Sequence, residues 1–522
     1  MSIFNTTDQK SNTKRALVLA GGGMRVSYQA GVIRALEQQG ITFQIFDATS
    51  GGTINLAMIL SGLDSQEVCQ RWERLDVSDF VSFMPFKEYI KLSFMPAWGD
   101  TDGIIQKVFP AMGIDLRKIQ NNTQAVASFN VCNYTDKINE TISHNDISVE
   151  QLVGSISLPI FMPAVDYKGK LYVDAVWLRG ANVKHAVQQG VEEIWLVWCI
   201  GNHETYSDGA FNQYIHMMEL STNGALNEEL DWLTELNRQI ESGSSPYGQQ
   251  KPVKLHVIKP EITLPSEVDV YLGKVTNNTL IDMGYSDAMQ YLESYNKDIS
   301  RSGEQLDYSA TKMRGALPGL IYNESYAGSL NPTTQAINIF QDETFDVKKI
   351  KLDLTIHIED AEGFIAGEHQ RARITGRIIL DNEEATIIQG QFVFSGIPEN
   401  SIEKFSLYKL NFQLREKSFI LEGRKKIKHV YGHDAWSDIV NMAVKLYVEI
   451  EKDETEKQRN IVADGIVKQG VSEVTKLIAS FHPLHAETTE QGNALVARYG
   501  KFLLGQYYLQ FMKSDKKWWK VW

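Results

Sequence analysis

A serine in a glycine-rich turn is the residue of this sequence best placed to carry out chemistry. Ser50 stands in the run Ala48-Thr49-Ser50-Gly51-Gly52, between a short apolar segment and a helix-like segment at residues 53–60. A strand, a sharp turn carrying a serine and a helix form a nucleophile elbow, which holds the hydroxyl at the C-terminal edge of a parallel sheet. Ala48 occupies the place where the usual pattern has its first glycine. The run predicts a nucleophile, and the structural alternative for Ser50 is a helix N-cap.

A second glycine-rich turn, Gly21-Gly22-Gly23, lies upstream between an apolar run at residues 15–20 and a helical pattern at residues 28–38. A helix that begins after three glycines can direct free N–H groups and its positive dipole end at a developing oxyanion. A P-loop would need a Lys-Ser/Thr pair, and a dinucleotide loop would need glycine where Val26 stands. We therefore predict that Gly21, Gly22 and Gly23 form an oxyanion hole.

These motifs make the sequence resemble the patatin-like phospholipases over about residues 14–295. The stretch from Gly21 to Val32 is similar to the oxyanion loop of that family, and Ser50 falls at its nucleophile. Gly154-Ser155-Ile156-Ser157-Leu158-Pro159, followed by the stretch from Gly169 to Asp174, is similar to the block that ends in the family's catalytic aspartate. The run from Gly284 to Ala288 is similar to the family's last helix. The resemblance implies a lipid acyl hydrolase with a serine–aspartate dyad.

In that dyad, the resemblance makes Asp174 the base that takes the proton of Ser50. A carboxylate is intrinsically too acidic for this task, so the site must raise its pKa or hold it very close to the hydroxyl. Arg25 is expected to brace the glycine loop or to meet the phosphate of a lipid headgroup. The family usually has Asp-Gly-Gly or Asp-Gly-Ala, whereas this chain has Asp174-Ala175-Val176.

Three alternatives to this hydrolase remain open from the sequence. The first is a lapsed enzyme that binds lipid without cleaving it, because Ala48, Ala175 and Val176 replace glycines. The second is an α/β-hydrolase triad with His203 or His256 as the base. The third is an acyltransferase that uses an alcohol in place of water.

Composition limits the possible functions further. The chain has 522 residues, a net charge of −13 and 43% apolar residues. An acidic chain is disfavoured as a nucleic-acid partner. Residues 1–14 lack the apolar core of a signal peptide, and no run is long enough for a membrane span. The scattered cysteines Cys69, Cys132 and Cys199 fit reduced thiols, so we expect a cytoplasmic protein. They lack metal-ligand spacing, so we expect no metal, and we expect no cofactor either.

The hydrophobic pattern predicts an α/β fold with a patatin-like parallel-sheet core and helices on both faces, followed by a mainly antiparallel β domain and a C-terminal helical segment. Near-continuous apolar runs at 125–132, 194–198 and 255–258 are typical of a parallel sheet covered on both sides. The expected boundaries are an acyl-hydrolase domain at 1–300, a connecting segment at 301–342, the β domain at 343–455 and the helical segment at 456–522.

Apolar clusters at residues 80–86 and 92–98 predict either a lid or wall for acyl chains or ordinary core beneath a helical insertion. The β domain alternates apolar and polar residues, most clearly at 350–358 and 372–380, which indicates a barrel or a sandwich. Its segments at residues 409–412, 419–425 and 434–438 resemble a β module attached to cholesterol-oxidase-like flavoenzymes.

The chain ends in a tail that interleaves lysines with Trp518, Trp519 and Trp522. This composition is typical of an interfacial anchor, with ammonium groups at the phosphates and indoles at the headgroup level. The alternative is a tail docked on the body of the protein through its indoles. We expect a lipid or membrane-surface substrate as the partner, with peripheral membrane contact through these three tryptophans as the anchor hypothesis.

Overall fold

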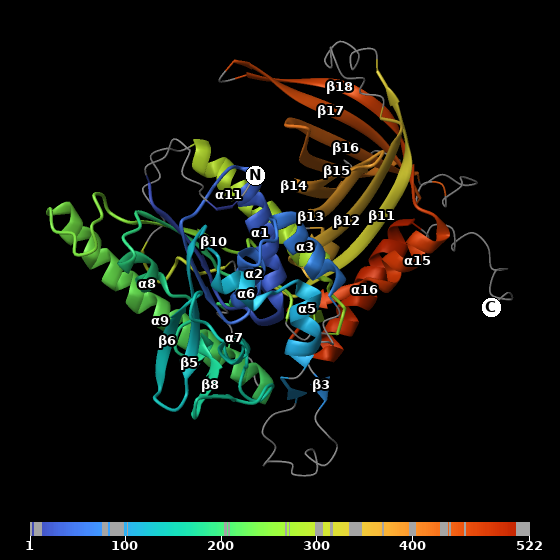
Figure 1. The fold of residues 1–522 in the computed structure, drawn as a ribbon. Helices are drawn as coiled ribbons and strands as arrows, with labels where there is room; N and C mark the ends of the chain where they lie inside the picture. The colour runs from blue at the N-terminus through green and yellow to red at the C-terminus, as the bar shows by residue number, and fades with distance from the viewer. Residues whose placement is uncertain are drawn as a thin grey trace. The chain divides into compact units, whose positions relative to one another are not determined.

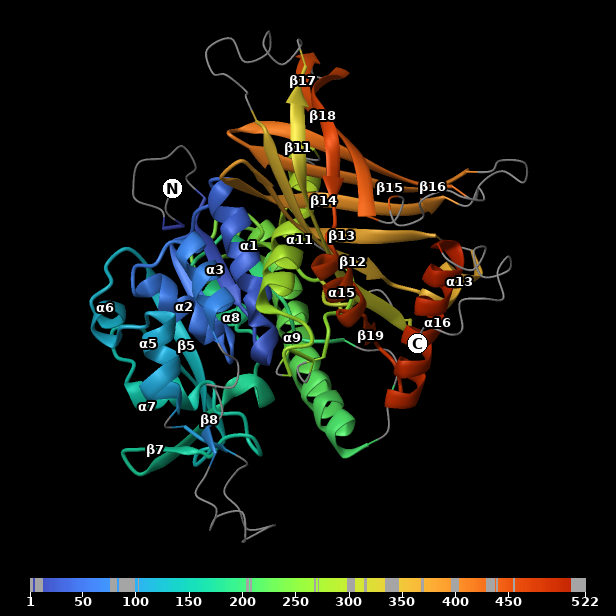
Figure 2. The same ribbon diagram turned by 90° about the vertical axis from the view of Figure 1, so that its right-hand side faces the viewer.

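We describe the protein from a computed structural model (Figures 1 and 2). It divides into two compact units, Met1–Gly315 and Ala316–Trp522, and each is described by itself. The residues whose structure is described are 3–4, 13–75, 82–83, 99–101, 103–202, 206, 209–266, 269–270, 272–297, 306–313, 317–333, 347–367, 370–395, 403–428, 437, 440–453 and 456–507.

The first unit alternates strands with helices, as its sequence pattern predicts. In chain order its elements are β1 (Arg15–Leu19), η1 (Gly23–Val26), α1 (Ser27–Gln38), β2 (Ile45–Thr49), α2 (Gly52–Leu60), α3 (Ser65–Arg74), β3 (Ser82–Phe83), β4 (Gly99–Asp100), η4 (Ile104–Val108), α5 (Phe109–Met112), α6 (Leu116–Gln120), β5 (Val126–Asn133), β6 (Ile138–Ser143), α7 (Val149–Gly154), β7 (Val165–Tyr167), β8 (Lys170–Asp174), η5 (Ala175–Trp177), α8 (Val183–Gln188), β9 (Glu193–Val197), α9 (Ala210–Glu241), β10 (Lys254–Ile258) and α11 (Asn277–Lys297).

The main sheet of this unit is mixed. Strands β10, β9, β1, β2 and β5 lie in that order and run parallel. Strands β6 and β8 both pair with β5 in the antiparallel direction, and β7 pairs with β8. The predicted parallel core is confirmed, and the antiparallel strands are an addition to it.

Helices cover both faces of this sheet. Apolar side chains of β1, β9 and β10 pack on one face against α8 and α9 in a single core cluster. On the other face, Trp195 of β9 stacks on His256 of β10, and both rings contact Tyr291 and Tyr295 of α11. Helix α11 also lies beside α1, as both views show. The predicted α/β arrangement with helices on both faces is therefore confirmed.

The second unit is built mainly from long antiparallel strands. Its elements are β11 (Gly319–Pro332), β12 (Lys349–Ile358), α13 (Ala361–Ala366), β13 (Arg371–Leu380), β14 (Glu383–Ser395), β15 (Glu403–Leu414), β16 (Lys417–Lys428), β17 (Asn441–Asp453), β18 (Glu456–Lys468), α15 (Val471–Ala479), β19 (His482–Leu484) and α16 (Thr489–Tyr507).

The sheet of the second unit closes on itself. Strands β12 to β18 follow one another in order, and β11 pairs with both β12 and β18. Of the two predicted alternatives, this is the barrel. Inward-facing apolar residues of all these strands form one core, which also includes Phe364 of α13 and Tyr499 of α16. The Tyr499 hydroxyl donates a hydrogen bond to the hydroxyl oxygen of Tyr322 on β11 at 3.0 Å.

Two predictions for this part of the chain need correction. Residues 319–332 were expected to lie in a connecting segment, but they form β11, the strand that closes the sheet. Residues 456–468 were expected to begin a helical segment, but they form β18, and helices start only at Val471. In both places pairing with neighbouring strands outweighs local composition, because each strand gains a full ladder of hydrogen bonds.

Candidate active site

The turn at Ser50 has the strained backbone of a nucleophile elbow. Ser50 lies between β2 and α2 with a φ of 54°, in the left-handed region that residues other than glycine seldom adopt. A Cβ atom at Gly51 would lie 2.6 Å from the carbonyl oxygen of Gly23, and one at Gly52 would lie 2.6 Å from that of Leu19. Two small residues are therefore required after Ser50, where the backbone of the glycine turn passes.

Asp174 meets Ser50 because β2 and β8 approach each other end to end along one edge of β5. Thr49, the last residue of β2, pairs with Asn130, and Asp174, the last residue of β8, pairs with Val131. The other edge of β5 is occupied at both positions by β6. The turn after β2 thus faces the end of β8, and the Ser50 hydroxyl donates a hydrogen bond to Asp174 Oδ2 at 2.6 Å.

The turn after Asp174 holds its carboxylate in place. The Val176 N–H donates to Asp174 Oδ1 at 2.8 Å, so one oxygen is held by the turn while the other accepts from Ser50. Asp174 is 2% exposed and Ser50 is 5% exposed, which places the pair in a largely water-free setting. Ala175 and Val176, the departures from the family pattern, are both buried and leave this geometry intact.

The sequence motif at residues 154–159 supports both ends of this arrangement. The Asp174 N–H donates to the carbonyl oxygen of Ser157 at 3.0 Å. The Ser155 hydroxyl lies 3.3 Å from Thr53 Oγ1, in the first turn of α2, and donates to the carbonyl oxygen of Leu152 at 2.7 Å. This segment therefore braces the elbow helix and the end of β8 together.

The glycine turn packs directly against the pair. A Cβ atom at Gly21 would lie 3.1 Å from Ser50 Cβ. The Gly21 N–H donates to the carbonyl oxygen of Gly180 at 2.9 Å, so this group is engaged within the protein and is not the free donor that the sequence predicts. For the N–H groups of Gly22 and Gly23, no acceptor is found among the described residues.

A buried chain of polar side chains fixes the glycine turn from behind, and the sequence did not reveal it. Trp72 Nε1 donates to Asn55 Oδ1 at 2.7 Å, and Asn55 Nδ2 donates to Gln29 Oε1 at 3.0 Å. Gln29 Nε2 in turn donates to the carbonyl oxygen of Ala20 at 2.7 Å. Helices α1, α2 and α3 are thereby tied to the residue that precedes the turn.

A second buried network lies under the elbow and joins β2 to the loop after Asp174. Asp47 accepts hydrogen bonds from Ser128 Oγ at 2.5 Å and from Asn130 Nδ2 at 2.6 Å. Asn130 Oδ1 accepts from Asn182 Nδ2 at 2.8 Å. Burial raises the pKa of the Asp47 carboxyl to about 8, although its two hydrogen bonds oppose the shift. Asp47, Ser128 and Asn130 are polar residues within otherwise apolar strands, and this is the sequence feature that could have indicated the network.

Several other predicted residues are placed as follows. Arg25 is 4% exposed within η1, which favours a bracing role over contact with a headgroup.

His256 lies on β10, separated from β2 by β9 and β1, so strand spacing alone puts its strand about 14 Å from that of Ser50. This distance excludes His256 as the base of a triad. The described residues do not include His203, Trp518, Trp519, Trp522 or most of the two apolar clusters.

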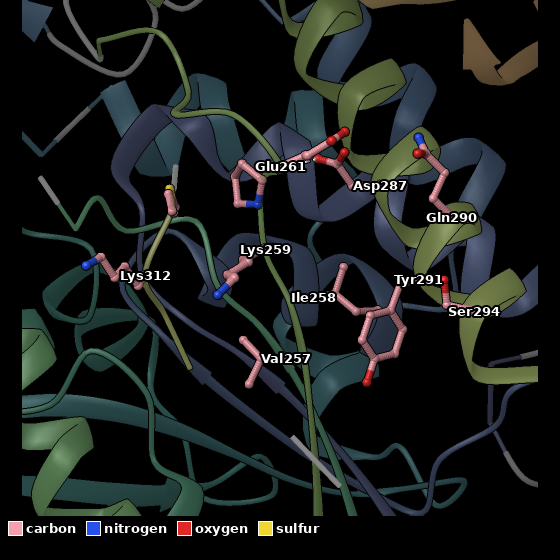
Figure 3. Close-up of a pocket in the computed structure, with 11 residues that line it drawn as sticks. Val257, Ile258, Lys259, Glu261, Asp287, Gln290, Tyr291, Ser294 and Lys312 are labelled. Atoms are coloured by element: carbon pink, nitrogen blue, oxygen red, sulfur yellow. Dashed lines mark hydrogen bonds between the residues drawn. The ribbon is translucent and has the colours of Figure 1, made fainter. Parts of the chain in front are cut away.

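A pocket of about 360 Å³ opens at the C-terminal end of β10, away from the pair (Figure 3). In Figure 3, Asp287, Gln290, Tyr291 and Ser294 reach it from α11. Its lining includes neither Ser50 nor Asp174. Some of its charged groups serve the fold: Lys259 Nζ donates to the carbonyl oxygen of Ala310 at 2.7 Å.

Within the described part of the chain, no group of three or more histidine, cysteine, aspartate or glutamate side chains is placed so that it could bind a metal ion. In the same residues, no helix is both long enough and apolar enough to cross a bilayer.

A strained serine turn after a parallel strand, facing a carboxylate at the end of a neighbouring strand and a glycine turn, is the arrangement expected of an α/β acyl hydrolase. Residues 17–187 match the model of the patatin-like phospholipase family, and this part of the chain is a patatin-like phospholipase domain. Because the match ends at residue 187, the resemblance of the β domain to a module of cholesterol-oxidase-like flavoenzymes stays a prediction.

Two similar proteins illustrate the match. Lysophospholipase NTE1 of Meyerozyma guilliermondii is 28% identical over 189 residues, which are 35% of this chain and 12% of that protein. The chain thus spans only a small part of this relative. The crystal structure of VipD from Legionella pneumophila is 12% identical with a TM-score of 0.29, covering 56% of this chain and 70% of that one. A TM-score this low supports no conclusion about fold or function.

Proposed function

We propose that this protein hydrolyses carboxylic esters of lipids, with Ser50 as the nucleophile and Asp174 as the base. The observation that carries the proposal is the 2.6 Å hydrogen bond from Ser50 Oγ to Asp174 Oδ2. Its setting is an elbow at positive φ inside a domain that matches the patatin-like phospholipase model. Glycerophospholipids and lysophospholipids are the proposed substrates, in keeping with the name of the NTE1 relative.

In the proposed mechanism, Asp174 takes the hydroxyl proton as Ser50 attacks the ester carbonyl. The N–H groups of Gly22 and Gly23 then receive the negative charge that develops on the carbonyl oxygen, while Gly21 holds the loop through Gly180. The protonated Asp174 gives its proton to the leaving alcohol, and an acyl-enzyme forms on Ser50. Water activated by the same carboxylate releases the fatty acid.

The position of Val176 argues against the alternative of a lapsed enzyme. If the bulkier turn had pushed Asp174 outward, the bond to Ser50 would be broken. Instead, the Val176 N–H donates to Asp174 Oδ1 and the turn holds the carboxylate on the hydroxyl. Transfer of the acyl group to an alcohol uses the same first step, so analysis of products with added acceptor alcohols separates transferase from hydrolase.

Labelling with a fluorophosphonate tests the nucleophile, because this reagent reacts with activated serines. We expect stoichiometric labelling at Ser50 and its loss in Ser50→Ala. Asp174→Asn should lower hydrolysis of lysophosphatidylcholine by at least 100-fold with an unchanged thermal midpoint. Ser242→Ala, at the exposed end of α9, serves as the matched control and should retain full activity. Full activity of Ser50→Ala, or a wild-type protein that resists labelling, contradicts the proposal.

Peripheral membrane contact through Trp518, Trp519 and Trp522 stays a proposal of its own. Co-sedimentation with phosphatidylcholine vesicles is expected to fall when the three are replaced by alanine, with hydrolysis of a water-soluble ester unchanged. Equal co-sedimentation of the variant would contradict the anchor.

A further inference from the structure

The interior of the closed sheet in the second unit holds polar and charged side chains among its apolar core. Glu324 and Tyr326 of β11, Ser406 and Tyr408 of β15, and Lys425 of β16 are all buried. Residues next to them in sequence are exposed or half-buried, so strand alternation points these five inward. Tyr326 and Tyr408 belong to the same apolar cluster as the other inward residues.

The buried carboxylate of Glu324 receives its hydrogen bonds from two neighbouring tyrosines. Glu324 Oε2 accepts a hydrogen bond from the Tyr326 hydroxyl at 2.9 Å and one from the Tyr408 hydroxyl at 3.0 Å. Two phenol donors stabilise a buried carboxylate without the help of a cation. Glu324 therefore does not need Lys425, and no ion pair joins them.

Lys425 has no such partner. Its Nζ lies 4.9 Å from the centroid of the Tyr326 ring, and no hydrogen bond or ion pair links it to any residue that the structure describes. The side chain is 4% exposed, so water supplies little compensation. Burial lowers the pKa of Lys425, while the charge of Glu324 opposes that shift. A buried ammonium without a hydrogen-bond acceptor is costly even with the charge of Glu324 nearby, and replacement by an apolar side chain is often favourable.

A second unsatisfied group stands directly beside it. Ser406 and Lys425 are opposite each other in the antiparallel ladder of β15 and β16, where facing Cβ atoms are about 5 Å apart. Ser406 is fully buried, and its hydroxyl has no hydrogen-bond partner within the described structure. An ammonium and a hydroxyl therefore lie together in an apolar interior, both able to donate and neither with an acceptor.

We propose that Lys425 and Ser406 bind the carboxylate of a long-chain fatty acid inside the closed sheet. Two donors side by side match the two oxygens of a carboxylate. The nearby charge of Glu324 already offsets that of Lys425 in part, and it disfavours a dianion such as a phosphate monoester more strongly than a carboxylate with its single charge. The surrounding core, which includes Leu421, Met442 and Val444, offers an apolar environment for the chain. Closed sheets of about this strand number can hold one small ligand.

This inference does not depend on the chemistry at Ser50, because the site lies in the second unit. The test uses the full chain carrying Ser50→Ala and measures binding of oleate by displacement of a fluorescent fatty acid. Lys425→Met is the test variant. The matched control is Lys409→Met, since Lys409 is an exposed lysine on β15 that faces the other way.

We expect Lys425→Met to weaken oleate binding at least tenfold and Ser406→Ala to weaken it about threefold, with Lys409→Met unchanged. Methyl oleate, which lacks the charge, should bind weakly and equally to all forms. In the absence of ligand, Lys425→Met should unfold at a higher temperature than its parent, which shows that lost binding is not lost folding. Equal oleate binding in Lys425→Met and its parent overturns the site. Tighter binding of lysophosphatidate than of oleate overturns the carboxylate assignment.

Discussion

Asp47→Asn gives the sharpest test of the buried network under the elbow. Asparagine has the size and shape of aspartic acid, so Oδ1 can still accept from Asn130 and Nδ2 can donate to the Ser128 hydroxyl. The substitution removes the only titration in this small cluster, since Ser128 and Asn130 do not ionise. The variant should therefore keep the fold and change only how its stability depends on pH.

The magnitude follows from the pKa of Asp47, which burial raises from 3.8 to about 8. Between these values the folded protein holds a proton that the unfolded chain releases, so stability is complete below about pH 4 and falls as pH rises. Each pH unit in this window removes about 1.4 kcal/mol from the free energy of unfolding. From pH 4 to pH 7 the wild-type protein should lose about 4 kcal/mol through this one group, and Asp47→Asn should lose none of it.

Urea unfolding of the first unit measures the effect, followed by the fluorescence of its buried tryptophans Trp72, Trp195 and Trp198. As the pH rises from 5 to 8, the wild-type protein should lose stability relative to Asp47→Asn by about 4 kcal/mol. Because other groups titrate equally in both, the difference between the curves isolates Asp47. Parallel curves from pH 5 to pH 8 would refute the assignment of a raised pKa to this carboxyl.

Three glycine substitutions test the packing around the site. In Gly284→Ala the new Cβ would lie 2.0 Å from the carbonyl oxygen of Tyr28, so α1 and α11 must separate, and we expect a loss of about 3 kcal/mol in the free energy of unfolding. Gly224→Ala, in an open part of α9, should instead add about 0.5–1 kcal/mol, and equal effects of the two in thermal unfolding would contradict the close crossing. In Gly22→Ala the new Cβ would lie 2.7 Å from Cys199 Sγ, so we expect about a 100-fold loss of ester hydrolysis that Cys199→Ala partly restores. Full activity of Gly22→Ala alone would remove the glycine turn from the site.

Much of the first unit follows from sequence because its signals are local. Three signals specify the elbow, and each acts within a few positions: the apolar run before Ser50, the small residues after it and the helical pattern beyond them. The fold class is confirmed for the same reason. The roles of Ser50 and Asp174 stay proposals, although the structure brings the two side chains into contact.

What the sequence could not predict depends on contacts between distant segments. Nothing in the run Lys170–Asp174 indicates that it pairs in the antiparallel direction with β5 and ends opposite the turn after β2. Gly21 was predicted as a donor because its N–H belongs to the turn, but its acceptor, Gly180, lies 159 residues further along the chain. Likewise, the turn-like composition of residues 319–332 concealed β11, whose stability comes from partners on both sides.

The closure of the second sheet through β11 sets the order in which this unit can be completed. The closing ladder pairs residues 327–332 of β11 with residues 463–468 of β18, so it joins the first strand of the unit to its last long strand. Strands β12 to β18 can add to the sheet one at a time, because each pairs with the strand that follows it in the sequence. The β11–β18 ladder instead has to close a loop that contains all the strands between these two, and such non-local pairing is slow. During synthesis, the first unit can therefore finish folding while β11 still waits for its second partner to emerge from the ribosome.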